Sequence, residues 1–174
     1  MVATGKARKP KFGVQSGANE LVRLADAWNT FAADHLPYQV LLLGKLLDRA
    51  TGKALRDNWN LTLAEWRVIA ELAVHGSATV VQLSESAWVD RAEVSRAAAS
   101  LEARGYIERS DNPNNRRSRF LLCTPAGQQL FEQIRTTRRD FFQEIMQSLS
   151  PAEIESCSQW LYAIARATLT VGAK

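Results

Sequence analysis

The sequence is poor in the residues that build metal sites, disulfide frameworks and membrane spans. Its 174 residues include only two cysteines, Cys123 and Cys157, and two histidines. These are too few for a disulfide framework and leave little material for a zinc site made of protein ligands alone. The longest apolar run, residues 40–43, is far shorter than the roughly 18 to 20 residues that cross a bilayer. We therefore expect a cytoplasmic protein without metal, cofactor or membrane anchor.

Positive charge is concentrated at the beginning of the chain. The formal net charge is +4, but four of the 22 basic residues and none of the 18 acidic residues lie within residues 1–17. The rest of the chain is neutral. A basic segment with Gly, Ala and Pro is typical of a disordered tail, which either touches nucleic acid without sequence preference or only aids solubility. Net charge alone does not identify the partner.

Beyond this tail, the apolar residues recur at helical spacing between turn signals. A content of 46% apolar residues suits one domain with a core, or two small halves that share one. Pro37 suits the first turn of a helix, and Thr124 followed by Pro125 opens another. Four further helix starts carry a polar cap followed three residues on by Glu or Gln. These pairs are Thr62/Glu65, Thr79/Gln82, Asp90/Glu93 and Ser150/Glu153.

One stretch breaks the helical pattern and predicts a β-hairpin. Residues 106–109 and 119–123 are short runs rich in Tyr, Ile, Phe and Leu, and the segment between them is dense in turn formers. Gly105, just before the first run, suits the residue that follows a helix C-cap. The predicted fold class is therefore mainly α with a small β-hairpin wing.

The order from Thr79 is a short helix, a turn, a longer helix over residues 90–104 and the hairpin, which is a helix-turn-helix with a wing. On a helical wheel the apolar side of the longer helix contains Val94 and Leu101. The opposite side carries small residues and one arginine, which would let the backbone approach the DNA major groove. The alternative is that the alanines are simply good helix formers. The expected DNA contacts on this helix are Arg91, Ala92, Ser95, Arg96 and Ala99.

The hairpin tip is the second candidate for DNA contact. Four arginines, no lysine and two acidic residues lie between Gly105 and Phe120. Arginine at a hairpin tip suits insertion into a narrow, negative minor groove, although arginine-rich turns also occur for solubility. The expected contacts here are Asn114, Asn115, Arg116, Arg117 and Ser118.

Four motifs of this sequence resemble the MarR family of bacterial transcription regulators over about residues 37–170. They are Trp66 within LTLAEWRVI, VDRAEVSR at residues 89–96, LEARGYI at residues 101–107, and NPNNRR at residues 112–117. The family usually writes the wing as Asp-Pro-x-Asp-Arg-Arg, whereas this chain has Asn112 and Asn115 at the two acidic positions. A hydrogen bond from Arg117 to Asn115 would lack charge assistance and should be weaker. Which of the two tip arginines enters the minor groove is therefore left open.

The resemblance implies a homodimer with an effector site. It implies a winged helix-turn-helix lobe at residues 59–123, between N-terminal helices at 18–58 and C-terminal helices at 124–170 that form a dimerisation lobe. The opening Leu36-Pro37-Tyr38 is similar to a branch that senses aromatic acids or their coenzyme A thioesters. The expected effector contacts are Trp28, His35, Tyr38, Gln39 and Trp66. Aromatic walls with a few polar groups suit a flat aromatic ligand, although Trp66 is also a candidate core residue and His35 a helix-end residue.

These observations predict a sequence-specific DNA-binding regulator, a homodimeric repressor released from a pseudo-palindromic operator by a small aromatic carboxylate or its coenzyme A thioester. Two alternatives remain: a thiol-based redox sensor working through Cys123 or Cys157, and a DNA-binding protein without a ligand. We do not expect an enzyme, because the sequence has no phosphate loop, nucleophile elbow or metal motif.

Overall fold

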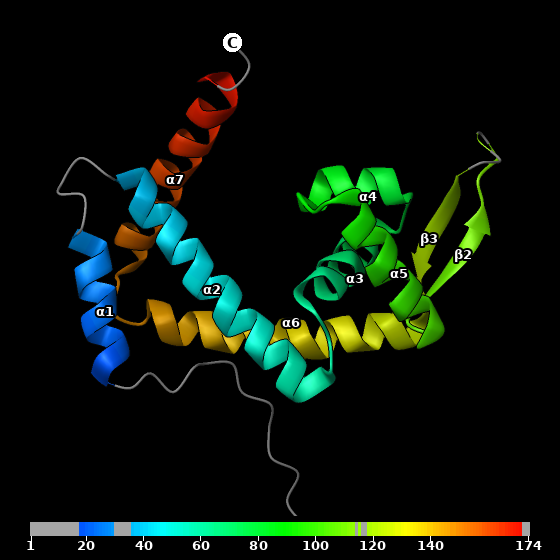
Figure 1. The fold of residues 1–174 in the computed structure, drawn as a ribbon, viewed down its shortest axis with the longest axis horizontal. Helices are drawn as coiled ribbons and strands as arrows, with labels where there is room; N and C mark the ends of the chain where they lie inside the picture. The colour runs from blue at the N-terminus through cyan, green and yellow to red at the C-terminus, as the bar shows by residue number, and fades with distance from the viewer. Residues whose placement is uncertain (1–17, 30–35, 114, 116–117, 172–174) are drawn as a thin grey trace, which may run out of the picture. The chain divides into compact units, whose positions relative to one another are not determined.

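The fold is mainly helical with one small antiparallel sheet, as the sequence predicts (Figure 1). The computed structural model describes residues 18–29, 36–113, 115 and 118–171, so the expected basic tail lies outside the described residues. The chain divides into two units, Met1–Thr137 and Arg138–Lys174. The elements are α1 (Ala18–Asn29), α2 (Leu36–Trp59), α3 (Leu63–His75), β1 (Ser77–Ala78), α4 (Val80–Ala87), α5 (Arg91–Ala103), β2 (Ile107–Asp111), β3 (Arg119–Cys123), α6 (Pro125–Met146) and α7 (Pro151–Val171).

Side-chain caps fix where the helices begin. The Thr62 hydroxyl accepts from the Glu65 backbone N–H at 3.1 Å, and the Glu65 carboxylate accepts from the Thr62 N–H at 2.6 Å. The same reciprocal pair forms at Thr79/Gln82 and at Ser150/Glu153. At α5 the described contacts are one-sided, since the Asp90 carboxylate accepts from the backbone of Ala92 and Glu93. Three of the four predicted capping boxes are thus confirmed, and the fourth is a simple N-cap.

The sheet has three strands in the order β1–β3–β2, all antiparallel. The predicted hairpin is confirmed: Ile107 pairs with Cys123 at its base and Asp111 with Arg119 toward its tip. Gly105 has φ 74°, in the left-handed region that favours glycine, and turns the chain from α5 into β2. The strand β1 is not predicted from the sequence, because its two residues, Ser77 and Ala78, are too few to show alternation.

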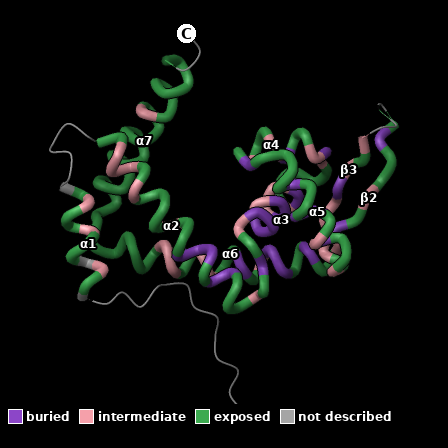
Figure 2. Tube along the Cα trace, viewed as in Figure 1, coloured by how far each residue is buried: buried purple, intermediate pink, exposed green. Residues whose placement is uncertain are grey.

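The core of the first unit lies among α3, α4, α5, the sheet, the end of α2 and the first half of α6 (Figure 2). Its fully buried large side chains are Leu55, Leu61, Val68, Ile69, Leu72, Leu83, Val94, Leu101, Ile107, Leu121 and Ile134. Both helices of the helix-turn-helix and both long strands contribute to this core. The face that the sequence predicts to contact DNA is therefore supported by a single packed core.

The terminal helices bury far less. In α7 no residue is buried, and Trp160 is 68% and Leu169 60% exposed. On α2 the buried residues all lie between Ala50 and Leu55, in its second half. Among the described residues, none of the helices combines the length and the apolar character needed to pass through a bilayer.

The start of α6 is held against the base of the wing. The Thr124 hydroxyl donates to the Gly105 carbonyl at 2.7 Å and accepts from the Gly127 N–H at 3.1 Å. The Thr124 N–H donates to the Tyr106 carbonyl at 3.0 Å. These hydrogen bonds bring the backbone of α6 close to the base of the wing. A Cβ on Gly127 would lie 2.0 Å from the Tyr106 carbonyl oxygen and 2.9 Å from the Cys123 sulfur. Only glycine fits at this contact.

We expect Gly127→Ala to lower the free energy of unfolding by at least about 2 kcal/mol, because the clash is with backbone and cannot be relieved by a rotamer change. Gly44→Ala is the matched control. Gly44 lies inside α2, and among the described residues a methyl group there would meet no atom within 4 Å beyond the adjacent part of its own helix, so alanine there should stabilise by about 0.5–1 kcal/mol. Urea unfolding of the three proteins measures both, and equal stability of the Gly127→Ala variant and the parent would contradict the close approach.

Candidate nucleic-acid interface

The turn between α4 and α5 is held by short polar contacts. The Ser84 hydroxyl donates to the Val89 carbonyl at 2.8 Å, and the Val89 N–H donates to the Ser84 carbonyl at 3.2 Å. Between them, Trp88 is the C-cap of α4 with φ 52° and ψ 43°, a left-handed conformation. Asp90 then caps α5 through the Ala92 N–H at 2.8 Å. These contacts set the angle at which α5 leaves α4.

The two faces of α5 are those that the helical wheel predicts. Val94, Ala97, Ala98 and Leu101 are buried against the core. The opposite face is exposed, and it consists of Ala92, Ser95, Arg96, Ala99 and Ala103, with Arg91 and Glu93 beside it. The arrangement of the faces is confirmed, and the contact of this face with DNA stays a prediction.

Two cations of this surface are available to an outside partner. Among the described residues, neither Arg91 nor Arg96 forms an ion pair or side-chain hydrogen bond. Small neighbours leave room around Arg96 for a base edge to approach, and a guanidinium can bond guanine with two donors. The exposed α5 face can therefore enter a major groove and present an unpaired guanidinium there.

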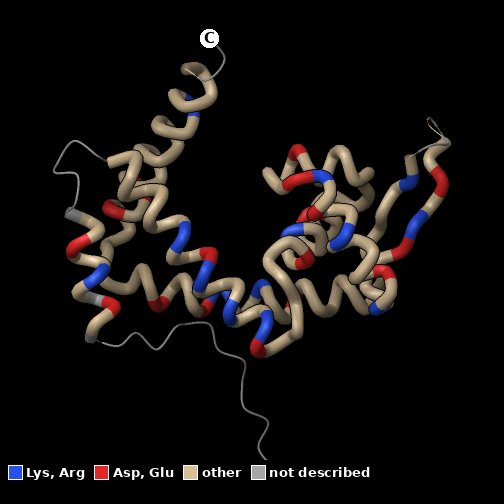
Figure 3. The backbone as a smooth tube through the Cα atoms, viewed as in Figure 1, with Lys and Arg blue, Asp and Glu red and all other residues tan. Residues whose placement is uncertain are grey.

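The two arginines on the strands of the wing are paired with acidic residues, one in the wing and one in α5. Arg119 pairs with Asp111 at 3.1 Å, and Arg109 pairs with Glu102 of α5 at 2.8 Å. Figure 3 shows acidic and basic residues interspersed along β2 and a basic residue on β3. Of the arginines between Gly105 and Phe120, Arg109 and Arg119 are thus neutralised by partners within the chain.

At the tip, two backbone hydrogen bonds join the described residues. The Asn115 N–H donates to the Asn112 carbonyl at 3.1 Å, and the Ser118 N–H donates to the Asn115 carbonyl at 3.0 Å. Asn112 is 9% exposed, Asn115 exposed and Ser118 half-buried. The predicted contacts Asn114, Arg116 and Arg117 lie outside the described residues.

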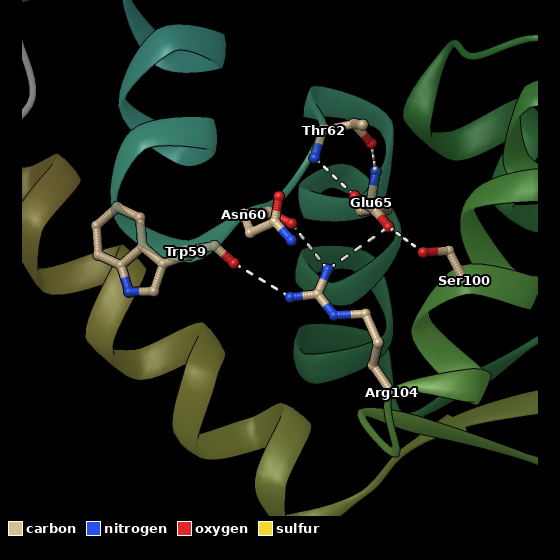
Figure 4. A network of polar contacts seen from close by, with 6 residues as sticks. All are labelled: Trp59, Asn60, Thr62, Glu65, Ser100 and Arg104. Carbon is tan, nitrogen blue, oxygen red and sulfur yellow. Dashed lines mark hydrogen bonds and ion pairs between the residues drawn. The ribbon is translucent and has the colours of Figure 1, made fainter.

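Sequence reasoning missed a polar cluster that joins three helices (Figure 4). The Glu65 side chain is 5% exposed, and its carboxylate accepts from the Ser100 hydroxyl at 2.5 Å and pairs with Arg104 at 3.8 Å. Arg104 also donates to the backbone carbonyls of Trp59 and Asn60, at 3.1 Å and 2.9 Å. A buried carboxylate needs such partners. Nothing in the sequence indicates this cluster, because the burial of Glu65 is visible only in the fold.

The expected effector residues are only partly brought together. Gln39 of α2 donates to the Trp28 carbonyl of α1 at 3.3 Å, and Tyr38 is half-buried beside Gln39 in the sequence. Trp66 is 7% exposed, and its ring stacks on Phe131 of α6 with centroids 5.7 Å apart. Trp66 is thus placed as a core residue of the winged lobe, and His35 lies outside the described residues.

The two thiols differ in their surroundings. Cys123 is half-buried at the end of β3, where burial raises the pKa of its thiol, and Cys157 is exposed on α7. A raised pKa disfavours the thiolate, which is the reactive form. Among the described residues, no three His, Cys, Asp or Glu side chains cluster in a way that could hold a metal ion.

A three-helix core whose third helix presents an exposed face next to a two-stranded wing defines a winged helix-turn-helix protein. Residues 61–118 match the family model described as the MarR family. The multiple antibiotic resistance protein MarR of Salmonella typhimurium is 27% identical over 133 residues, which are 72% of this chain and 92% of that protein. The chain is thus similar to the MarR family of transcription regulators, and the matched segment, residues 61–118, contains the helix-turn-helix and most of the wing.

Two solved structures share the fold at lower identity. A mutant MarR from Escherichia coli complexed with operator DNA is 22% identical with a TM-score of 0.65, covering 86% of this chain and 99% of that one. The second is a structure on the regulation of DNA binding of Bordetella bronchiseptica BpsR by 6-hydroxynicotinic acid. It is 22% identical with a TM-score of 0.67, covering 76% of this chain and 94% of that one.

Arg96→Ala should weaken specific DNA binding by about 1–3 kcal/mol, the range for losing one good base contact. Because Arg96 is exposed and unpaired within the described part of the chain, its loss should change the free energy of unfolding by less than about 0.5 kcal/mol. Fluorescence anisotropy with a labelled duplex measures the affinity, and Arg56→Ala on the exposed side of α2 is the control. An unchanged footprint and affinity in Arg96→Ala would refute the assignment of the recognition face.

Proposed function

We propose that this chain is a homodimeric repressor that binds a pseudo-palindromic operator in double-stranded DNA. The observation that carries the proposal is the exposed face of α5, where small side chains surround an unpaired Arg96. In this proposal α5 reads the major groove through Arg91, Ala92, Ser95, Arg96 and Ala99. The wing tip, with Asn114, Asn115, Arg116, Arg117 and Ser118, reaches the adjacent minor groove. Such a protein works where the DNA is, in the cytoplasm of a bacterium, and it needs no catalytic residue.

Dimerisation is supported by the apolar residues that the terminal helices leave exposed. Ile145, Leu149 and Ile154 are 41%, 38% and 39% exposed, and Trp160 and Leu161 are more so. Exposed apolar side chains in such number mark an interaction surface. We assign residues 18–58 and 124–170 to this interface and residues 59–123 to DNA binding. A dimer explains specificity, because two half-sites read together are required for tight binding.

The experiment for this proposal is selection from a pool of random duplexes. We expect enrichment of a pseudo-palindrome whose half-sites lie about one helical turn, roughly 10 base pairs, apart. Sedimentation of the purified complex should give two chains per duplex. A chain that enriches no sequence, or that binds as a monomer, is not the proposed repressor.

The proposed effector is a small aromatic carboxylate or its coenzyme A thioester, bound beside Trp28, His35, Tyr38 and Gln39. The hydrogen bond from Gln39 of α2 to the Trp28 carbonyl of α1 supports the proximity of these two residues. In this proposal Trp66 forms at most one wall of the effector site, because its ring already stacks on Phe131. The regulation of BpsR by 6-hydroxynicotinic acid shows that a protein of this fold can respond to an aromatic acid.

His35→Ala and Trp28→Ala should each weaken the release of operator DNA by an aromatic acid while leaving operator affinity intact. The physical reason is that a ligand shifts the equilibrium between the DNA-bound and the released protein only by its difference in affinity for the two. Each substitution removes a side chain that contributes to that difference. A panel of benzoates, cinnamates and their coenzyme A thioesters is titrated against the preformed complex, and quenching of tryptophan fluorescence that the parent shows and Trp28→Ala lacks reports binding beside Trp28. Val22→Ala, a change at a 61% exposed residue of α1, is the control.

If both variants respond like the parent, the ligand site lies elsewhere on the chain. The same titration carried out with peroxide instead of an acid tests the thiol alternative, for which the raised pKa of Cys123 is unfavourable. Release by peroxide would support that alternative. A regulator released neither by the acids nor by peroxide would fit the alternative of DNA binding without a ligand.

A further inference from the structure

Trp88 is the most exposed of the large apolar side chains in the described part of the chain. Its side chain is 80% exposed, although it sits inside the helix-turn-helix between the buried Leu83 and Val89. Tryptophan buries more apolar surface than other residues when it finds a partner. Nothing described in this chain covers the ring, so burial of its apolar surface does not stabilise the fold.

The backbone at Trp88 is unfavourable for such a residue. At φ 52° and ψ 43° it is left-handed, a conformation that glycine and asparagine adopt readily and bulky residues rarely do. The turn itself does not need the indole, because it is closed by backbone and hydroxyl contacts of Ser84 with Trp88 and Val89. A smaller residue would satisfy the turn equally well. The indole therefore points to a contact outside the chain.

The position of Trp88 identifies that contact. Trp88 precedes the α5 cap Asp90 by two residues, so their Cα atoms are at most about 7.6 Å apart. The first residues of a recognition helix reach the base edges, and the turn before them lies at the rim of the groove, where the phosphates are. The unpaired Arg91 continues the same surface.

We propose that Trp88 is a further DNA contact, whose ring lies on the sugar–phosphate backbone at the rim of the major groove. This inference rests on the proposed DNA-binding function. The apolar face of the indole would cover deoxyribose, and its N–H would donate to a phosphate oxygen. Because the indole is neutral, the contact adds affinity without releasing a counterion. Because it touches no base, it adds the same affinity on every sequence.

Trp88→Asn is the decisive variant, because it removes the ring and relaxes the backbone together. Its melting temperature should equal or exceed that of the parent, since asparagine tolerates the left-handed conformation. Its affinity for DNA should nevertheless fall about ten-fold, as expected for losing the burial of an aromatic side chain. The fall should be equal on a duplex selected by the parent chain and on an unrelated duplex. The slope of log affinity against log salt should not change.

Two further variants separate the ring from other effects. Trp88→Phe keeps an aromatic ring on the same strained backbone and should retain most of the affinity. Val74→Asn makes the same kind of change at a 64% exposed residue of α3, outside the helix-turn-helix, and should bind like the parent. A direct readout is the fluorescence difference between the parent and Trp88→Phe, which acrylamide should quench in the free protein and quench less once DNA is bound.

The outcomes distinguish this inference from the proposed function. If Trp88→Asn binds as tightly as the parent while Arg96→Ala does not, Trp88 is no DNA contact and the proposed function stands. Unchanged access of acrylamide to the indole in the DNA complex would likewise exclude Trp88 as a contact. If only the selected duplex loses affinity, the backbone assignment is overturned. If the parent chain binds neither duplex, the proposed function itself fails.

Discussion

The buried carboxylate of Glu65 is the constraint on which the DNA-binding lobe depends. An anion that is 5% exposed must be paired and hydrogen-bonded, and its partners come from more than one helix. The Thr62 N–H lies at the start of the helix that contains Glu65, whereas Ser100 lies in α5 and Arg104 is the C-cap of α5, four residues further on. Satisfying Glu65 fixes the rotation of α5 about its axis. The face with Arg96 is then turned outward.

The same cluster ties the end of α2 to α5. The last carbonyls of a helix have no partner within the helix, and they carry its negative dipole end. Arg104 donates to the Trp59 and Asn60 carbonyls, so the guanidinium satisfies these groups as well as Glu65. A displacement of this end of α2 would thus cost hydrogen bonds on the recognition helix. The cluster therefore connects α2, which we assign to dimerisation, with α5, which we assign to DNA binding. This holds for any cause that displaces α2.

What the sequence could predict is local, and what it missed is long-range. Caps, helix faces and Gly105 follow from residues at most a few positions apart, which is why the α5 faces and three of the four expected capping boxes were predicted correctly. Glu65 looked like the second half of a capping box, and that role is real; its second role requires Ser100, 35 residues away. The strand β1 exists only through pairing with β3, and the pairing of Arg109 with Glu102 depends on how the wing leaves α5. The left-handed turn at Trp88 had no signal, because neither glycine nor asparagine marks it.

The distribution of charge on this surface says what kind of DNA binding it can support. Arg109 and Arg119 are paired within the chain, and Arg104 is committed to Glu65 and α2. Within the described part of this surface few cations therefore remain for phosphates, and each phosphate contact adds to the salt dependence of affinity. Close approach is a second source of affinity, which does not depend on charge. The alanines of α5 permit that approach, and a neutral contact at the groove rim strengthens binding without adding charge. In the proposed complex, the unpaired guanidinium of Arg96 would be the main described group that discriminates between sequences, and a dimer would present it twice.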